Sequence, residues 1–213
     1  MNNCEMKCWD GVFPYIEIND FYNEDELEKV WKDIDSISYG NKLLDPSQSK
    51  SAYFGGQLLK NNSGVFVEAC LPDSNIIKIN AHRLTEIDYT QHSAWYFKNT
   101  PFVCNDNSTL LSYYENASYY KPHRDNAFFT ILIWLYKEPK RFTGGNLHFP
   151  DYNHSIEVKN NRFIMFPSMI RHAVDEVSIE EEYRDKFLGR YCLTVFALHN
   201  YQLGQYHTNV PLP

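Results

Sequence analysis

The sequence predicts an all-β core of the jelly-roll type with flanking helices. From Thr109 onward, short runs rich in β-branched and aromatic residues follow one another at regular spacing. Turn-forming sequences such as Thr143-Gly144-Gly145 and Lys159-Asn160-Asn161 separate several of these runs. Eight strands without an intervening helix fit two facing antiparallel sheets. The runs are TLLSYYE, SYYKPH, AFFTILIWLY, GNLHFP, SIEVK, RFIMFP, HAVDEV and RYCLTVFAL.

The N-terminal half predicts a strand and two helices that support this core. Residues 13–21 alternate as a strand does, and Asn23 with Glu26 forms a helix-start signature. Helical spacing marks the packing face of the first helix: Leu27, Val30, Trp31 and Ile34. A second helix near Ser74 is expected to carry one apolar face: Ile77, Ala81 and Leu84. We expect one domain over residues 1–213, with the support over 10–105 and the jelly roll over 109–198.

Residues 39–64 lie between the two helices and are rich in Gly, Ser, Asn and Lys. A long segment without periodicity is usually functional or mobile, and the alternative here is a short strand pair with turns. If this segment is a lid over a functional site in the β core, Tyr53 and Phe54 would cover the substrate bound there. Lys50 would then be free to meet an acidic group on that substrate.

Composition narrows the partners and the compartment. The net charge of −7 argues against a nucleic-acid surface, because phosphate binding needs clustered Lys and Arg. No apolar run suggests a signal peptide or a membrane span, so neither a membrane partner nor an extracellular location is expected. The five cysteines are scattered and predict no disulfide framework, which favours a reducing cytoplasm.

Three residues form a candidate metal site. His123 and Asp125 stand two apart, and His172 follows in FPSMIRHAV. Two imidazoles and one carboxylate hold Fe(II) and leave three coordination positions open for oxygen chemistry. His-x-Asp alone is a weak signal, since it also occurs by chance. On a strand, His123 and Asp125 would share a face, while Arg124 would face elsewhere, toward substrate or solvent.

The run RYCLTVFAL suggests a second polar site. Residues two apart share a strand face, so these residues point one way: Arg190, Cys192, Thr194 and Phe196. A guanidinium beside a hydroxyl could clamp a carboxylate through charge-assisted hydrogen bonds. Burying Arg190 without an anion would be costly, so an inward Arg190 predicts a ligand or an acidic partner. The alternative is an exposed arginine at a strand edge.

Over about residues 110–198 the motifs occur in an ordered series: Tyr114, His123-Arg124-Asp125, Gly144-Gly145-Asn146-Leu147, Phe166-Pro167-Ser168, His172 and Arg190-Tyr191-Cys192. In this order the chain resembles the 2-oxoglutarate and Fe(II)-dependent dioxygenases, specifically the prolyl hydroxylase branch. Two positions depart from that pattern. Ala117 stands where a turn glycine is usual, and Cys192 replaces the commoner serine and is not treated as a hydroxyl donor.

The resemblance implies a double-stranded β-helix of the cupin-like type, with Fe(II), 2-oxoglutarate and O2 as cofactor and co-substrates. Iron would be held by His123, Asp125 and His172. The distal carboxylate of 2-oxoglutarate would be held by Arg190, with hydrogen bonds from Thr194 and Tyr114. If Arg190 is not the clamp, Lys186 and Arg184 are the next candidates. Related halogenases lack the Asp125 carboxylate, so its presence favours hydroxylation.

The resemblance also implies a substrate of the amino-acid type, with an unactivated C–H bond as target. A prolyl residue in a peptide or protein is expected first, and a free amino acid or other small metabolite is the alternative. If residues 39–64 do not cover the substrate, its contacts are expected from Tyr120, Arg124 and Trp134.

Two other classes remain open from the residues alone. A zinc hydrolase could use the same His/Asp/His set with a metal-bound water, but it would have no need of Arg190 and Thr194. A jelly-roll binding module would need no metal ligands. Under the dioxygenase interpretation alone, anaerobic Fe(II) with 2-oxoglutarate gives a weak visible charge-transfer band.

Overall fold

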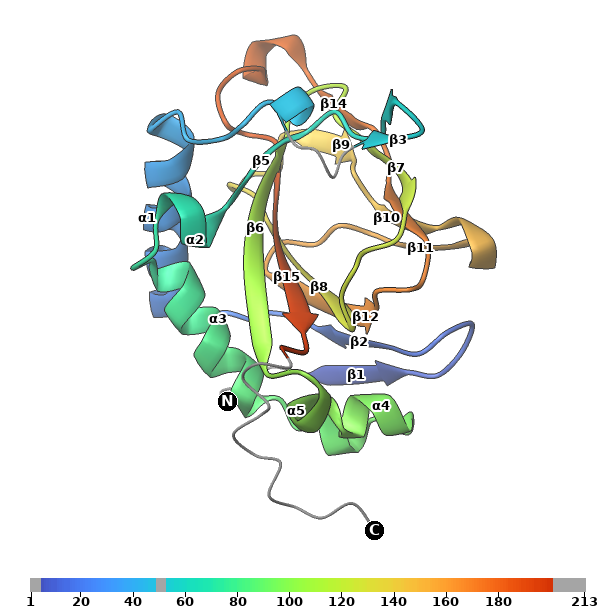
Figure 1. Ribbon diagram of the computed structural model, residues 1–213. Helices are drawn as coiled ribbons and strands as arrows, with labels where there is room; N and C mark the ends of the chain where they lie inside the picture. The colour runs from blue at the N-terminus through green and yellow to red at the C-terminus, as the bar shows by residue number, and fades with distance from the viewer. Residues whose placement is uncertain (1–4, 49–52, 201–213) are drawn as a thin grey trace.

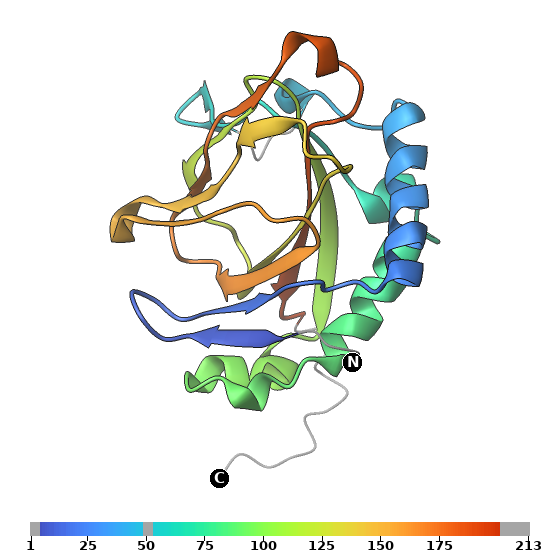
Figure 2. The same cartoon turned by 180° about the vertical axis from the view of Figure 1, so that it is seen from behind.

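Two antiparallel sheets face each other in the computed structural model, which describes residues 5–48 and 53–200 (Figures 1 and 2). The larger sheet has seven strands in the order β1-β2-β12-β8-β15-β6-β5. Their bounds are β1 Met6–Trp9, β2 Tyr15–Ile18, β12 Arg162–Pro167, β8 Phe129–Leu135, β15 Arg190–Leu198, β6 Asp106–Tyr114 and β5 Ser63–Phe66. The smaller sheet has the order β11-β10-β13-β7. Its strands are β11 His154–Ile156, β10 Leu147–Phe149, β13 His172–Val174 and β7 Tyr120–His123.

Two further strand pairs and five α-helices complete the described part of the chain. The pairs are β14 (Val177–Ile179) with β9 (Phe142–Gly144), and β3 (Tyr53–Phe54) with β4 (Gln57–Leu58). The helices are α1 Glu24–Tyr39, α2 Val67–Cys70, α3 Asn75–Glu86, α4 Trp95–Lys98 and α5 Thr100–Val103. An all-β core with flanking helices is therefore confirmed. No helix among the described residues is long and apolar enough to cross a membrane.

The central strands β8 and β15 divide their side chains between two apolar clusters. On one face, Ile131 and Ile133 of β8 and Leu193 of β15 pack in the cluster that contains residues of α1 and α3. On the other face, Leu132 and Cys192 join the cluster formed between the two sheets. The alternation expected for RYCLTVFAL is thus confirmed, because Arg190, Cys192, Thr194 and Phe196 all line one cavity.

Helix α1 begins as the sequence predicts. Asn23 accepts a hydrogen bond from the Glu26 N–H, and the Glu26 carboxylate accepts one from the Asn23 N–H, each at 2.9 Å. Val30 and Ile34 of the expected stripe are fully buried, and Leu27 and Trp31 pack partly against the same cluster.

Helix α3 begins after its Ser74 cap as expected, and its predicted packing face is partly confirmed. The buried residues are Ile76, Asn80 and Arg83, while Ala81 is exposed and Ile77 and Leu84 are partly buried. The polar residues can be buried because they find partners. Asn80 accepts a hydrogen bond from the buried Tyr22 hydroxyl, and Arg83 donates to the Phe21 carbonyl.

Several strands differ from the expected runs. HAVDEV forms two strands, β13 and β14, and β14 pairs with β9, which the sequence analysis treated as a turn. Strand β2 covers only Tyr15–Ile18 and is buried on both faces, because Ile16 and Ile18 pack in one apolar cluster and Tyr15 packs in the other. Since β1, β2 and β5 belong to the same sheet as β8 and β15, the support and the jelly roll share one sheet.

Residues 39–64 contain the strand pair that was the alternative to a loop. After the end of α1, the bridge Leu44↔Gly64 closes the segment at its base, and Lys60↔Tyr120 joins it to β7. The β3–β4 hairpin turns at Gly55 and Gly56, whose φ angles of +57° and +79° suit glycine. Lys50 lies outside the described residues.

Ala117 occupies a left-handed backbone conformation with φ of +62°. That conformation costs an L-residue about 1–2 kcal/mol and costs glycine little, although glycine loses more backbone entropy on folding. We expect Ala117→Gly to raise the free energy of unfolding by up to about 1 kcal/mol in denaturant titrations. The control Ala197→Gly, within β15, should lower it by about 1 kcal/mol. Equal destabilisation by both changes would contradict this account.

Candidate active site

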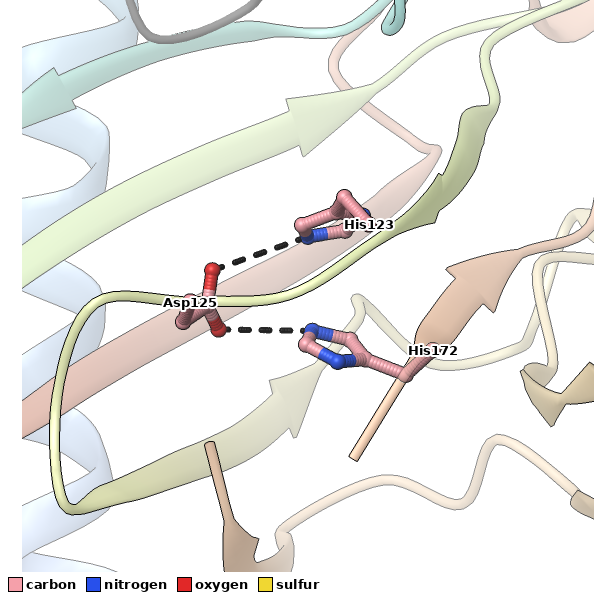
Figure 3. A group of neighbouring side chains, drawn as sticks. All are labelled: His123, Asp125 and His172. Carbon is pink, nitrogen blue, oxygen red and sulfur yellow. Dashed lines mark ion pairs between the residues drawn. The ribbon is translucent and has the colours of Figure 1, made fainter. Parts of the chain in front are cut away.

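His123, Asp125 and His172 converge between the two strands β7 and β13. His123 ends β7, His172 begins β13, and the two are direct cross-strand partners. Asp125 lies beyond the end of β7 rather than on it, which corrects the expectation of a shared strand face. Its N–H donates to the Ser168 carbonyl at 3.2 Å, and this contact turns the side chain toward both imidazoles (Figure 3). One ligand atom from each residue lies within 4.8 Å of the others.

The ring orientation of both histidines suits metal binding. The Nδ1 atoms of His123 and His172 lie 2.9 Å from the carbonyls of Lys121 and Ile170, respectively. A carbonyl only accepts, so each Nδ1 carries a proton, and in this orientation the Nε2 of a neutral imidazole presents its lone pair toward Asp125. The Nε2 atoms face the two oxygens of Asp125 at 3.6 Å and 3.3 Å.

The directions in which the pKa values of His123 and Asp125 are shifted also suit metal binding. Burial, and then the neighbouring His172, lower the pKa of His123 to about 4, so this imidazole is neutral near pH 7. Burial acts to raise the pKa of Asp125, but the hydrogen bond and charge of His172 lead the opposing effects and hold it below its usual value. The neutral Nε2 of His123 facing a carboxylate oxygen sets one acceptor against another. A cation between them resolves this conflict, so the donor set fits Fe(II).

A short hydrogen-bond chain fixes the Asp125 carboxylate. The Thr130 hydroxyl donates to Asp125 Oδ2 at 2.6 Å, and the Ser168 hydroxyl lies 2.9 Å from Thr130 Oγ1. Because Thr130 has one hydroxyl proton, Ser168 donates to Thr130. Both hydroxyls are fully buried. Partners of this kind orient a metal ligand from behind.

The triad opens into a cavity of about 1070 Å³ that also contains Arg190. Arg190 is 1% exposed, and its guanidinium lies over the rings of Tyr114 at 4.6 Å and Trp134 at 5.6 Å. None of its three side-chain nitrogens has a hydrogen-bond partner among the described residues. The remaining segments, 1–4, 49–52 and 201–213, contain no Asp or Glu. A buried guanidinium without an anion is costly, so the site is built for an anionic ligand.

Gly145 makes room for this arginine. Its φ is +71°, and a Cβ there would lie 2.9 Å from both Arg190 Cδ and Val177 Cγ2. Across the β15–β6 pair, Arg190 stands directly opposite Tyr114. Tyr114 and Thr194 line the same cavity, and the Thr194 hydroxyl lies 3.7 Å from the Cys192 sulfur. One polar patch in the cavity that the triad also lines is therefore formed by Tyr114, Arg190, Cys192 and Thr194.

The residues expected to contact substrate divide into two groups. Tyr120 and Arg124 line the cavity, and the Tyr120 ring stacks on His123 with 3.6 Å between ring centroids. Trp134 does not fit that role. It is 0% exposed and is not among the described residues that line the cavity, because the Arg190 guanidinium lies over its ring.

The two alternative candidates for the carboxylate clamp lie outside the described cavity lining, whereas one residue that was not predicted lies inside it. Arg184 and Lys186 donate to the carbonyls of Ile179 and Glu182, and neither belongs to the described lining. The sequence analysis missed Lys60, which is buried in the cavity beside Tyr120. The one local signal was its apolar context, Leu58-Leu59-Lys60, which is unusual for an exposed lysine.

Comparisons with known proteins relate part of this chain to one family model and its fold to several solved structures. Residues 109–198 match the family model described as the 2OG-Fe(II) oxygenase superfamily. A search of the curated proteins gave no match.

Solved structures share the fold at low sequence identity. A prolyl-4-hydroxylase of Pseudomonas putida aligns with a TM-score of 0.59 and 14% identity, covering 87% of this chain and 92% of that one. A prolyl 4-hydroxylase of Phytophthora capsici gives 0.55 and 15%, covering 93% and 63%. The non-heme α-ketoglutarate-dependent epimerase SnoN from nogalamycin biosynthesis gives 0.54 and 10%, covering 86% and 76%. At such identities the similarity is one of fold.

Proposed function

We propose that this chain, whose residues 109–198 belong to the 2OG-Fe(II) oxygenase superfamily, hydroxylates an unactivated C–H bond of an amino-acid-type substrate. A prolyl residue in a peptide or protein is the first candidate. A free amino acid or other small metabolite is the second. The chain is an oxygenase that uses Fe(II), 2-oxoglutarate and O2. The observation that carries the proposal is the unpaired, buried Arg190 in the same cavity as the triad, which neither a zinc hydrolase nor a binding module would require.

We assign His123, Asp125 and His172 as the iron ligands. When bound, Fe(II) with 2-oxoglutarate and O2 supplies the oxidant for C–H hydroxylation, and 2-oxoglutarate leaves as succinate and CO2. The chain's own part is to present two imidazole Nε2 atoms and an oriented carboxylate at one point. We also place the protein in a reducing cytoplasm, where its four described free thiols and a ferrous ion would persist.

We assign Arg190 to the distal carboxylate of 2-oxoglutarate. Its planar guanidinium can donate two parallel hydrogen bonds to a carboxylate. Thr194 and Tyr114 would add hydroxyl donors. Burial raises the pKa of Tyr114, with Arg190 acting in the opposite direction, so its phenol stays protonated and able to donate. Ligand binding would remove the cost of the unpaired guanidinium.

Cavity size and the groups at its edge support a peptide over a free amino acid. The volume of about 1070 Å³ matches the upper range of pockets for drug-sized ligands. Three exposed aromatic residues line it as well, namely Tyr53, Phe54 and Phe66. Exposed aromatic groups beside a cavity suit an extended chain with apolar side chains. Because an epimerase shares the fold, hydroxylation itself is part of the proposal.

A substrate screen tests this function. Fe(II)-loaded protein with 2-oxoglutarate and O2 is incubated with Pro-containing peptides and with free amino acids, and succinate is measured. We expect peptides to increase succinate formation and to gain one oxygen atom in mass spectra. Stimulation by free amino acids alone would favour the second candidate. A stimulating substrate recovered without added oxygen would contradict hydroxylation.

We also propose that the β3–β4 hairpin closes over the substrate. Phe54 is 78% exposed and Tyr53 is half-exposed, yet both line the cavity. Closure would exclude water from the reacting centre. We expect chymotrypsin cleavage after Tyr53 and Phe54 to slow when metal, 2-oxoglutarate and a substrate from the screen are all present, and much less with the first two. Cleavage after Trp95, which is 70% exposed and outside the described lining, is the internal control. Equal protection in the apo protein would show ordinary packed structure.

A further inference from the structure

Lys60 is a second buried cation in the same cavity. It is 4% exposed, and its ammonium lies 5.9 Å from the centroid of the Tyr120 ring, which itself stacks on His123. Two backbone hydrogen bonds fix its position, from the Lys121 N–H to the Leu59 carbonyl at 2.8 Å and from the Asn61 N–H to the Tyr119 carbonyl at 2.9 Å. The Lys60 backbone is therefore held beside Tyr120, whose ring stacks on His123.

No carboxylate pairs with Lys60 among the described residues. The acids that line the cavity are Asp45 and Asp125, and both are engaged. Asp45 accepts from the N–H and hydroxyl of Ser47, and Asp125 belongs to the triad. The segments that the structure does not describe contain no Asp or Glu. Burial lowers the pKa of the Lys60 ammonium, the direction expected for a cation without a nearby carboxylate.

The charges around the cavity favour an anionic ligand, although the whole chain carries a net charge of −7. Arg124 and Arg171 share one carboxylate, that of Asp151, at 3.5 Å and 3.2 Å. Arg190 is assigned to the distal carboxylate of 2-oxoglutarate. Among the described lining residues, Lys60 is then the buried cation that has neither a carboxylate partner nor an assigned ligand. A buried charge of this kind is compensated when a ligand supplies the opposite charge.

We propose that Lys60 binds a carboxylate of the substrate, so that the substrate is an acidic peptide or an acidic amino acid. This inference rests on the proposed function, because it concerns the same cavity. Lys60 follows the β3–β4 hairpin by two residues, and the exposed Tyr53 and Phe54 of that hairpin line the cavity. A carboxylate at Lys60 would therefore lie between the cavity edge and the triad. The other source of a carboxylate here is the 2-oxo acid end of 2-oxoglutarate, and the experiment separates the two.

The test uses matched acid and amide ligands. Short prolyl peptides are prepared in pairs, with Glu or Gln, Asp or Asn, and a free or amidated C-terminus. Binding to protein loaded with Mn(II) and 2-oxoglutarate is measured by calorimetry without oxygen, so no turnover is needed. We expect the best acid to bind at least about tenfold tighter than its amide, as a charge-assisted hydrogen bond implies. Lys60→Met should reduce that ratio to about one, and Lys60→Arg should retain part of it.

Lys121→Met is the matched control. Lys121 also lies 5.9 Å from a tyrosine ring, that of Tyr119, but it is exposed and outside the described lining. The Lys121→Met variant should keep the full ratio of acid-peptide to amide-peptide affinity. Folding is checked by thermal unfolding of the apo protein, where Lys60→Met should melt at the same or a higher temperature than the wild type, because it removes an unpaired buried charge.

Any of four results would overturn the proposal. Acid and amide members could bind the wild type equally, or neither could bind measurably. Lys60→Met could weaken 2-oxoglutarate itself tenfold while the ratio stays intact, which would assign Lys60 to the co-substrate. Lys60→Met could lower the melting temperature and leave the ratio unchanged, which would make Lys60 structural. Carboxylate binding at Lys60 without succinate formation from any peptide would instead contradict the proposed function alone.

Discussion

Asp125→Ala and His172→Ala are each expected to abolish iron retention and O2-dependent succinate formation while leaving the protein folded. Each change removes one of three donors that face a common point within 4.8 Å. Changes to residues that merely support metal ligands cost about 10–100-fold, so loss of a ligand should exceed a hundredfold. Iron per chain after gel filtration, succinate formation and circular dichroism are the measurements.

His148→Ala is the matched control for the metal prediction. His148 lies on β10 opposite Ala173, one residue from His172, and hydrogen-bonds Ser155 outside the described cavity lining. This variant should retain iron and turnover. Full iron-dependent turnover in both Asp125→Ala and His172→Ala would place the iron site elsewhere in the chain.

Arg190→Met is expected to weaken 2-oxoglutarate binding by about 2–5 kcal/mol, the usual cost of leaving one partner of a buried charge pair alone. The variant fills much of the same volume, and it removes a guanidinium that has no partner among the described residues, so stability should be retained or increased. Arg190→Lys should recover part of the affinity, because a point charge cannot reproduce the fork. Calorimetry with Mn(II)-loaded protein gives the dissociation constants.

Lys186→Ala controls for loss of positive charge near this site. Lys186 is exposed and donates to the Glu182 carbonyl, so 2-oxoglutarate affinity should not change. If Arg190→Met binds 2-oxoglutarate as the wild type does, the clamp assigned here is wrong. The distal carboxylate would then have to be bound by another cation of the cavity, with Lys60 as the first to test.

Local sequence patterns predicted the features that depend on local geometry. The period of two in β15 is enough to bring Arg190, Cys192 and Thr194 to one face. The Asn23–Glu26 capping box is a contact within one turn and was predicted correctly. The ordered motifs from Tyr114 to Arg190 likewise identified the family that the match over residues 109–198 supports.

Features that depend on distant partners were not predictable in the same way. The α3 face was predicted only in part, because the buried Asn80 and Arg83 are satisfied by Tyr22 and Phe21, some sixty residues away in sequence. Asp125 reaches the triad through the Ser168 carbonyl rather than through strand alternation. Lys60 is brought to the cavity by its bridge to Tyr120. Trp134 shares a strand face with the cavity residue Leu132, but the Arg190 guanidinium lies over its ring.

The joint assignment of iron to the triad and of 2-oxoglutarate to Arg190 has one direct test. Anaerobic protein loaded with Fe(II) is titrated with 2-oxoglutarate, and visible absorbance is recorded. We predict a weak charge-transfer band that saturates in the wild type, requires higher 2-oxoglutarate in Arg190→Met, and is absent in Asp125→Ala. A wild-type protein that binds Fe(II) but gives no band at any 2-oxoglutarate concentration would contradict the account.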